Sequence, residues 1–406
     1  MIWADDLILL SESQAGLEKM LSELKNYTET NGMKLNIKKT KVMIFNKTGR
    51  HMRRNIYFGT DKIETTREYK YLGFKVTPSG EITSGLKDLK DRAMRAFAKT
   101  KKKLGAFFRT KPEITLKIFK SLIIPILLYA SDFWGILNLP ANNPIETVHM
   151  SFCKQLLGVQ KCTTNIGVLL ELGEIPLMLY AKKNALKNWS RIANKLKCND
   201  LTSETYESAI EKDLVWPRYI ENTITKNGLR GLFLVQSKDT HTQVFQRMKD
   251  IFLQESFSDI NSDNSKLRTY GKFKQTAGYE SYLNDIKDLR VRSSFTKLRL
   301  SNHELMIEKG RHQKKKLERY ERVCPFCPLQ IEDEIHFLLE CSCYQRLRGH
   351  LFTEANEKLP NFKYLQNTQK FFLLMNNQKL TSITPKYIHE MMETRKVSTE
   401  AQNTQI

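Results

Sequence analysis

Two adjacent carboxylates, Asp5 and Asp6, lie near the start of the chain in the run MIWADDLILLS. The apolar residues on both sides favour β-strands, so the pattern predicts a hairpin whose turn carries both carboxylates. Buried carboxylates are costly without a compensating cation, and Mg²⁺ suits them because it prefers one or two carboxylates plus water and phosphate oxygens. A pair of such ions about 3.5–4 Å apart can activate a hydroxyl and stabilise a leaving oxygen in phosphoryl transfer. The alternative is a solvated turn, since so short a motif also occurs by chance.

A second group of metal-ligating residues lies late in the chain. Cys324, Cys327, His336 and Cys341 form the pattern C-x2-C-x8-H-x4-C. Three thiolates and one imidazole complete a tetrahedral Zn²⁺ site with no open position, which predicts a structural site. Zinc binding would also supply much of the folding free energy of so small a module. Cys343 is a spare thiol, and the alternative is a set of cysteines packed in a reduced core.

The charge balance predicts a polyanionic partner. A formal net charge of +22 over 406 residues favours nucleic acid, because lysine and arginine clusters neutralise phosphates. An anionic membrane surface would attract the same charge, but the most apolar run, residues 122–134, is too short to span a bilayer and contains Pro125. No charged-then-apolar leader opens the chain, and its seven mostly scattered cysteines suit a reducing compartment. We therefore expect a nuclear or cytoplasmic protein that is not secreted and has no membrane partner; the oligomeric state stays open.

The elements that would position the acidic hairpin follow it directly. Ser11 and Ser13 are possible N-caps of an amphipathic helix that ends before Gly32. Alternation predicts a strand over residues 33–45, and residues 69–76 predict another that ends at a turn over residues 77–80.

Helical patterns dominate from Ser84 onward. An apolar stripe there predicts a long helix, and Glu113 to Trp134 predicts a second one interrupted by Pro125. The first of these helices has a one-sided basic surface, whereas an ordinary solvated face mixes charges of both signs. Its basic residues are Lys87, Lys90, Arg92, Arg95, Lys99, Lys101, Lys102 and Lys103.

The middle and end of the chain carry weaker signals. A helix should stop at Gly173 and restart after Pro176, with Glu171 and Glu174 as surface charges. A second basic cluster favours phosphate contact, with a nuclear-import signal as the compatible alternative. It comprises Arg311, Lys314, Lys315, Lys316, Arg319 and Arg322. We expect His303, His312 and His350 at the surface, and we expect a disordered polar tail beyond Glu393.

The residues around Asp5 and Asp6 resemble the aromatic-Ala-Asp-Asp hairpin of reverse transcriptases, in the form found in LINE-type (non-LTR) retrotransposons. This resemblance implies that Asp5 ligates the catalytic Mg²⁺ and that Asp6 supports it. It also implies that Lys39 approaches the nucleotide triphosphate, with Lys41 as a substitute and a solvated strand-edge lysine as the alternative. The Leu72-Gly73 pair is similar to the primer grip of these enzymes, although Gly73 could also be a structural bulge.

The same resemblance extends to the basic residues and to the cysteines. It implies that Lys99, Lys101, Lys102 and Lys103 on a thumb helix hold RNA and DNA as a template–primer duplex. For Lys314, Lys315 and Lys316, the expected contact with nucleic-acid phosphates follows from their charge. The Cys₃His pattern is similar to the cysteine-histidine module that closes many LINE-type open reading frames.

The fold expected from these signals is α+β, a truncated polymerase palm sheet followed by a mainly helical thumb and connector and a small zinc-knuckle module. The expected boundaries are palm 1–82, thumb 83–137, helical connector 138–265, basic segment plus zinc module 266–360, and helical segment with tail 361–406. In the family, the fingers and the first catalytic aspartate precede the hairpin, so we expect this chain to be a carboxy-terminal part that does not polymerise alone. One alternative is a non-catalytic nucleic-acid-binding protein derived from a decayed element, and another is a genuine protein that extends upstream of Met1.

Overall fold

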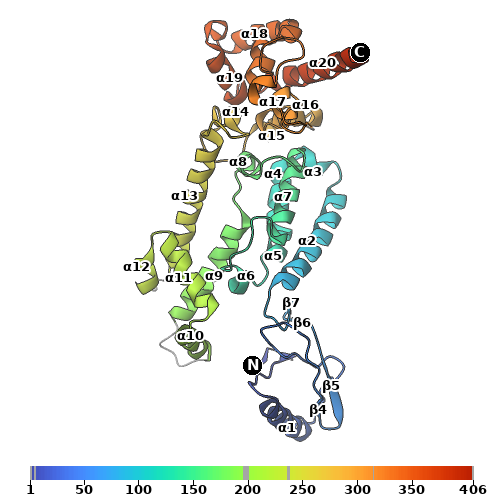
Figure 1. Cartoon of the computed structure of the whole chain (residues 1–406), viewed down its shortest axis with the longest axis vertical. Helices are drawn as coiled ribbons and strands as arrows, with labels where there is room; N and C mark the ends of the chain where they lie inside the picture. The colour runs from blue at the N-terminus through green and yellow to red at the C-terminus, as the bar shows by residue number, and fades with distance from the viewer. Residues whose placement is uncertain (1, 4–5, 195–200, 236–237, 314, 405–406) are drawn as a thin grey trace. The chain divides into compact units, whose positions relative to one another are not determined.

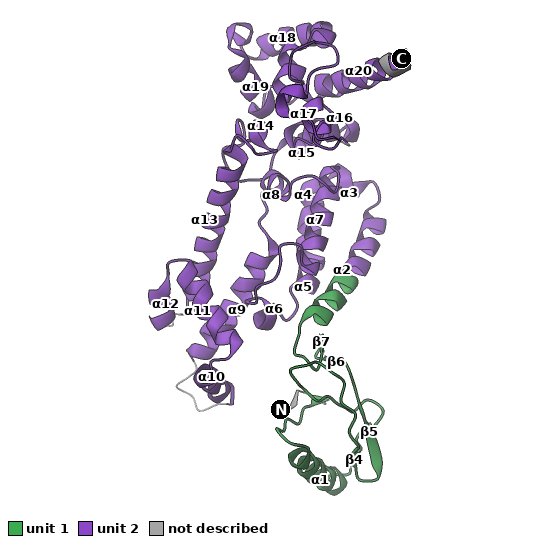
Figure 2. Cartoon of the chain, in the orientation of Figure 1, with its two compact units in different colours: residues 1–92 green, residues 93–406 purple. Residues whose placement is uncertain are grey.

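The computed structural model describes residues 2–3, 6–194, 201–235, 238–313 and 315–404 (Figure 1). The chain divides into two compact units, unit 1 (residues 1–92) and unit 2 (residues 93–406), coloured separately in Figure 2. Unit 1 contains small β-sheets and one complete helix, whereas unit 2 is almost entirely helical. The α+β prediction of a small amino-terminal mixed sheet followed by a helical region is therefore confirmed.

The acidic hairpin is present. Strand β1 (Ile2–Trp3) pairs antiparallel with β2 (Asp6–Leu7), and Trp3 lies opposite Asp6. Asp6 therefore belongs to the second strand and not to the turn. Helix α1 (Gln14–Thr30) follows, and the Ser13 side chain accepts a hydrogen bond from the Gly16 amide, as its N-cap prediction requires.

A mixed three-stranded sheet comes next, in the order β3-β5-β4. Strand β3 (Lys41–Val42) runs parallel to β5 (Asp61–Thr65), which pairs antiparallel with β4 (Ile56–Phe58). Leu21 of α1 packs on Ile56 and Ile63 and forms the core of unit 1. This small core holds the helix against the sheet.

The strand predicted over residues 33–45 is wrong for most of its length. Only Lys41 and Val42 pair with another strand. The Lys39 and Thr40 amides both donate to the Asn36 carbonyl, at 3.1 and 2.9 Å, and close a turn. Asparagine favours such turns because its side chain also bonds nearby backbone, here the Lys39 amide at 3.2 Å.

The single strand predicted over residues 69–76 is also wrong. Strands β6 (Tyr69–Tyr71) and β7 (Phe74–Val76) form a tight hairpin instead. Its two turn residues, Leu72 and Gly73, have φ of 44° and 83°, the left-handed pair that two-residue hairpins need. The following turn is confirmed, since the Gly80 amide donates to the Thr77 carbonyl at 3.0 Å.

The long basic helix is α2 (Thr83–Leu104), and the predicted apolar stripe is buried at Leu86, Leu89, Ala93 and Phe97. The second helix is divided at Pro125, as predicted, and a left-handed residue at position 130 divides it again. Its parts are α4 (Pro112–Leu122), α5 (Ile124–Leu127) and α6 (Ser131–Trp134), preceded by α3 (Phe107–Thr110) and followed by α7 (Pro144–Leu157). In unit 2, the rings of Phe119 on α4 and Phe152 on α7 stack with centroids 3.7 Å apart.

The predicted stop and restart near Gly173 is confirmed. Helix α8 (Asn165–Leu172) ends at Gly173, whose φ is 66°, and α9 (Leu177–Ala193) begins after Pro176. Four further helices complete this region: α10 (Leu201–Glu211), α11 (Val215–Lys226), α12 (Arg230–Val235) and α13 (Thr240–Asn261). They pack around Trp189, which is fully buried with Ile220 and Val244.

The rest of unit 2 consists of short helices and two longer ones. The short elements are α14 (Arg268–Gly271), α15 (Tyr282–Asp285), α16 (Leu289–Arg299), α17 (Met306–Lys309), η1 (Arg319–Glu321), η2 (His336–Glu340), η3 (Ser342–Tyr344), η4 (Phe362–Tyr364) and α19 (Asn367–Asn376). The longer ones are α18 (Gln345–Lys358) and α20 (Thr384–Thr404).

The disordered tail expected beyond Glu393 is wrong, because α20 continues through Thr404 near the carboxy terminus (Figure 1). Arg395 on this helix is buried, and its guanidinium binds the Glu332 carboxylate with two hydrogen bonds of 2.7 and 2.8 Å. The polar composition beyond Glu393 gave no indication that Arg395 pairs with Glu332. Within the described part of the chain, no helix combines the length and apolar character needed to cross a bilayer.

Candidate metal centre and nucleic-acid interface

The predicted magnesium ligands are only partly described. Asp5 lies outside the described residues. Asp6 is exposed in β2, so its carboxylate is open to solvent at the start of the second strand.

The predicted nucleotide and primer residues lie in two different turns of unit 1. Lys39 is exposed in the turn closed by Asn36. Leu72 and Gly73 form the β6–β7 turn, and the Arg92 guanidinium of α2 donates to the Gly73 carbonyl at 2.9 Å. Asp88 lies 3.0 Å from Arg92 and 3.3 Å from Lys70. These contacts hold the β6–β7 hairpin against helix α2.

The predicted phosphate-binding lysines of α2 differ in their surroundings. Lys99, Lys102 and Lys103 are exposed. The Lys101 ammonium donates to the Gln155 side chain at 2.6 Å and lies 5.2 Å from the centre of the Phe108 ring. Lys101 is also exposed, so all four lysines present charge to solvent, but Lys101 in addition contacts Gln155 and Phe108 within unit 2.

The four predicted zinc ligands come together. One ligand atom each from Cys324, Cys327, His336 and Cys341 all lie within 4.8 Å of one another. The Cys341 sulfur is 3.8 Å from that of Cys324 and 3.7 Å from that of Cys327. Tetrahedral Zn²⁺ with zinc–sulfur bonds of about 2.3 Å would separate its sulfurs by about 3.8 Å, so the spacing fits this ion.

The histidine and the thiols have few polar neighbours outside the cluster: the Cys327 sulfur lies 3.3 Å from the Ser342 hydroxyl, and His336 Nδ1 lies 3.6 Å from the Glu340 carboxylate. Among the residues that the structure describes, neither buried ring nitrogen of His336 has a hydrogen-bond partner, which is unusual for an imidazole and natural for a metal ligand. The hydrogen bond from Cys341 lowers the pKa of Cys324 to about 4, and the interaction with Cys324 raises the pKa of His336 to about 9. Thiolate character at Cys324 is what a dication requires.

Backbone hydrogen bonds around the cluster position its four ligands. An isolated bridge between Val323 and Ile331 closes the loop that carries both Cys324 and Cys327. Asp333 accepts the His336 amide at 2.9 Å, and the Cys341 amide donates to the His336 carbonyl at 2.8 Å in the π-helical turn η2. The ligands are thus positioned by hydrogen bonds within residues 323–341.

The second basic cluster is not a uniform phosphate-binding surface. Lys315 and Lys316 are exposed in a loop, and Lys314 lies outside the described residues. Arg322 is buried, and its guanidinium donates to the Leu317 and Ile307 carbonyls. Arg322 therefore stabilises this loop through buried hydrogen bonds. The prediction that it contacts phosphates is wrong.

The prediction that Glu171 and Glu174 are surface charges is wrong. Glu171 is fully buried, and it accepts hydrogen bonds from Arg299 at 2.6 Å, Tyr282 at 2.6 Å and Tyr270 at 2.8 Å. Burial would raise the pKa of Glu171, but the adjacent Arg299 charge lowers it below its usual value. Glu174 is also buried, 2.6 Å from the ammonium of Lys120.

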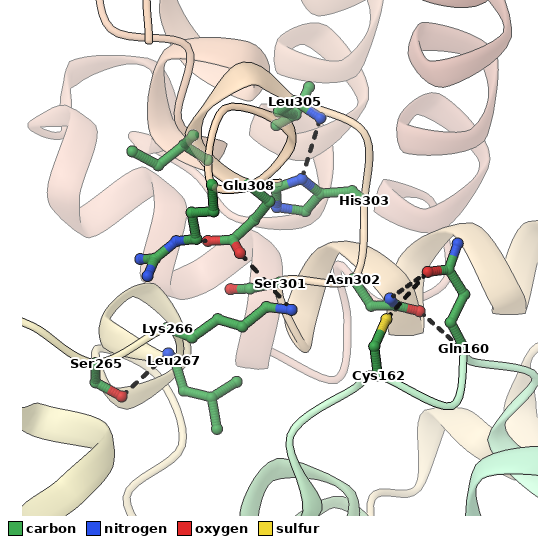
Figure 3. Close-up of polar contacts among 12 residues, drawn as sticks. Gln160, Cys162, Ser265, Lys266, Leu267, Ser301, Asn302, His303, Leu305 and Glu308 are labelled. Carbon is green, nitrogen blue, oxygen red and sulfur yellow. Dashed lines mark hydrogen bonds and ion pairs between the residues drawn. The ribbon is translucent and has the colours of Figure 1, made fainter. Parts of the chain in front are cut away.

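His303 is also inside the protein and not at its surface as predicted. Its side chain is 1 % exposed, and its Nε2 lies 3.0 Å from Glu334, which in turn accepts bonds from Ser301 and Thr269. In Figure 3, His303 and Glu308 lie near the extended side chain of Lys266, whose ammonium is 3.7 Å from the Glu308 carboxylate.

A neighbouring contact in Figure 3 joins segments that are far apart in sequence. The Gln160 backbone amide donates to Oδ1 of Asn302 at 2.9 Å, and the Cys162 thiol donates to Oε1 of Gln160 at 3.3 Å. Asn302 thus connects the loop after α7 to the segment that follows α16.

Sequence reasoning missed these buried charges, although one signal was available. Glu171 stands within the apolar helix NIGVLLEL, where a lone carboxylate must be buried and needs a cation. No comparable signal identifies Arg299 as that cation, because the two residues are 128 positions apart.

Comparisons with known proteins agree with the placement of the hairpin. Residues 1–76 match the family described as reverse transcriptase (RNA-dependent DNA polymerase). A transposon-derived protein of Caenorhabditis elegans is 27 % identical over 161 residues, which cover 39 % of this chain and 56 % of that protein. The match spans about half the length of this relative. The chain therefore begins with a reverse transcriptase family domain and is distantly related to a transposon-derived protein.

Proposed function

We propose that this chain is part of a LINE-type retrotransposon RNA-directed DNA polymerase and that it holds a template–primer duplex of RNA and DNA. The observation that carries the proposal is an acidic hairpin, with Asp6 opposite Trp3, inside the segment that matches the reverse transcriptase family. A polymerase of this family needs carboxylates for metal and cations for phosphates, and unit 1 offers both types.

In this proposal Asp5 and Asp6 hold Mg²⁺, whose chemistry when bound is to polarise the reacting phosphate and lower the pKa of the primer hydroxyl. The exposed carboxylate of Asp6 suits this hard cation. Lys39 contacts the triphosphate, and the Leu72-Gly73 turn approaches the primer end, where the small Gly73 leaves room for a backbone. The reaction joins the primer 3′-hydroxyl to the α-phosphate of a deoxynucleotide and releases pyrophosphate.

Phosphate contacts outside the catalytic hairpin would come from the lysines of α2 and from the loop of Lys315 and Lys316. Lys99, Lys102 and Lys103 support this role because they are exposed on one helix. The Cys₃His centre has a structural role with zinc, consistent with its closed set of four ligands. Thiolate zinc sites need a reducing compartment, which supports a nuclear or cytoplasmic location.

The second candidate function is nucleic-acid binding without catalysis. Its supporting observation is that Lys99, Lys102, Lys103 and the four Cys₃His residues belong to unit 2, whereas the acidic hairpin belongs to unit 1. A primer-extension assay on an RNA template with Mg²⁺ distinguishes the two functions.

Incorporation by the wild type that is lost in Asp5→Asn and Asp6→Asn would support an active polymerase, and it would contradict our expectation that this chain does not polymerise alone. Salt-sensitive duplex binding that survives both substitutions, without incorporation, supports the binding protein. Failure to bind template–primer duplex at low salt would contradict both candidate functions.

A further inference from the structure

Unit 2 contains a cavity of about 680 Å³ that none of the roles proposed above uses. It lies among α6, α9 and the start of α13, three helices of which both α6 and α13 pack on α9 (Figure 1). Its volume is within the range of about 300–1,000 Å³ typical of small-ligand sites. The cavity therefore has room for a ligand of nucleotide size.

The cavity wall is richer in positive than in negative charge. Among the described residues that line it, Lys187, Arg191 and Lys238 are cationic and Asp132 is the one carboxylate. Arg191 and Lys187 are exposed, and the Arg191 guanidinium donates to Asn188 at 2.9 Å, which orients its planar group. A guanidinium held in this way suits a phosphate, which accepts two parallel hydrogen bonds.

Polar residues of α9 that are three or four positions apart in sequence line the cavity. Asn184, Asn188 and Arg191 lie on one side of the helix, while Ala185 and Trp189 are buried in the core. The Asn184 side-chain amide donates to the Ser131 hydroxyl at 2.8 Å, and Leu128 adds an apolar side chain to the cavity wall. Amide groups beside an apolar surface match the edge and the face of a nucleobase.

One buried hydroxyl in the cavity wall has no partner. Ser190 is 3 % exposed, and among the described residues its Oγ forms no hydrogen bond. Buried polar groups are nearly always satisfied, so an unpartnered hydroxyl in a cavity wall indicates a missing hydrogen-bonding group. Charge, size and this hydroxyl all point to a polar anionic ligand.

We propose that this cavity binds a phosphorylated nucleoside, either free or as one nucleotide of a strand. Arg191 and Lys187 contact the phosphate, and Ser190 with the two asparagines contacts the nucleoside. The site includes no residue of unit 1, so the inference does not depend on the proposed polymerase activity.

The test is calorimetric titration of the full chain with adenosine monophosphate, adenosine and a short single-stranded RNA. Adenosine monophosphate should bind saturably, and Arg191→Gln should weaken it by about tenfold or more, as expected for loss of a charged hydrogen bond. The matched control is Arg247→Gln, which removes the same charge from an exposed position of α13 outside the cavity wall. Ser190→Ala should also weaken binding, while the melting temperature without ligand stays the same or rises.

The remaining arms identify the source of the nucleotide. RNA that displaces adenosine monophosphate, and that binds more weakly to Arg191→Gln, indicates a strand, whereas RNA that does not displace it indicates the free nucleotide. Absence of saturable binding by both adenosine monophosphate and RNA would overturn the proposal. Equal binding of adenosine and its monophosphate, or equal losses in Arg191→Gln and Arg247→Gln, would overturn it as well.

Discussion

At the scale of single residues, Arg299 is a charged group enclosed inside unit 2, with 1 % of the residue exposed. Its guanidinium binds Glu171 and Glu280, donates to the Met375 carbonyl, and lies within 4.9 Å of the Phe273 and Tyr282 ring centres. A buried charge is tolerated only when such partners replace water. Removing one partner should therefore cost more than removing an exposed ion pair.

We predict that Glu171→Gln lowers the free energy of unfolding by about 3–5 kcal/mol, because Arg299 would lose a fully buried counter-charge. Urea denaturation measures the change. The matched control is Glu207→Gln, an exposed carboxylate on α10, which should change stability by no more than about 0.5 kcal/mol. Equal effects of the two substitutions would contradict the buried-pair account.

The same residue predicts a pH dependence. The pKa of Glu171 is lowered in the folded protein, so its ionised form stabilises the fold above the unfolded pKa of about 4.3. This contribution is lost as the pH falls below that value towards the folded pKa. Wild-type stability should then fall more steeply than that of Glu171→Gln, by up to about 1.4 kcal/mol per pH unit. Urea midpoints between about pH 5 and about pH 3 check this, and parallel slopes would exclude it.

At the scale of elements, local signals identified helices better than strands. The Ser13 cap, the break at Pro125 and the stop at Gly173 follow from residues next to the feature they control. The single strand expected over residues 69–76 failed because Leu72 adopts a left-handed conformation that its side chain does not favour. The Cys₃His ligands could be predicted from spacing alone, whereas the partners of Glu171 depend on contacts between distant segments.

We predict that Gly173→Ala destabilises unit 2 by about 2–4 kcal/mol, because a Cβ would add a clash to the strained left-handed backbone. An added Cβ would lie 2.6 Å from the Tyr279 amide nitrogen. Gly228→Ala is the control, since its φ of 74° is similar but a Cβ there meets no atom within 4 Å. Thermal melting should show the larger loss for Gly173→Ala, and equal losses would show that the close approach is unimportant.

For α2, we predict that the triple substitution of Lys99, Lys102 and Lys103 by Gln weakens binding to template–primer duplex. These charges are exposed on one helix, and the salt slope of log K should fall by about 0.9 for each phosphate that is no longer neutralised. Fluorescence anisotropy over a range of salt concentrations measures both the affinity and the slope.

The control for this experiment removes three exposed lysines from elsewhere in unit 2, by substitution of Lys212, Lys358 and Lys379 with Gln. It has the same change in net charge. If both triple variants bind alike, general charge and not α2 attracts the nucleic acid.

At the scale of the whole molecule, the Cys₃His centre is joined to distant parts of unit 2 through buried ion pairs. Glu332 lies in the loop between the Cys324–Cys327 pair and the His336–Cys341 pair, and it accepts two hydrogen bonds from Arg395 of α20. It also accepts the Met306 amide at the start of α17. Loss of the metal should therefore affect more than the residues that bind it.

We predict one Zn²⁺ per chain, lost in Cys341→Ser and retained in Cys343→Ser, because Cys343 is outside the ligand group. Atomic absorption measures the metal content. Chelation should lower the melting temperature of the wild type and leave that of Cys341→Ser unchanged. Equal zinc contents in the two variants would refute the ligand assignment.

The last long helix has a consequence for gene truncation. A stop codon shortly before Arg395 would remove the polar stretch that begins there, and it would leave the carboxylate of Glu332 enclosed without its cation. Translation must therefore continue past Arg395 before residues 323–341, which carry the candidate metal ligands, can reach their most stable form.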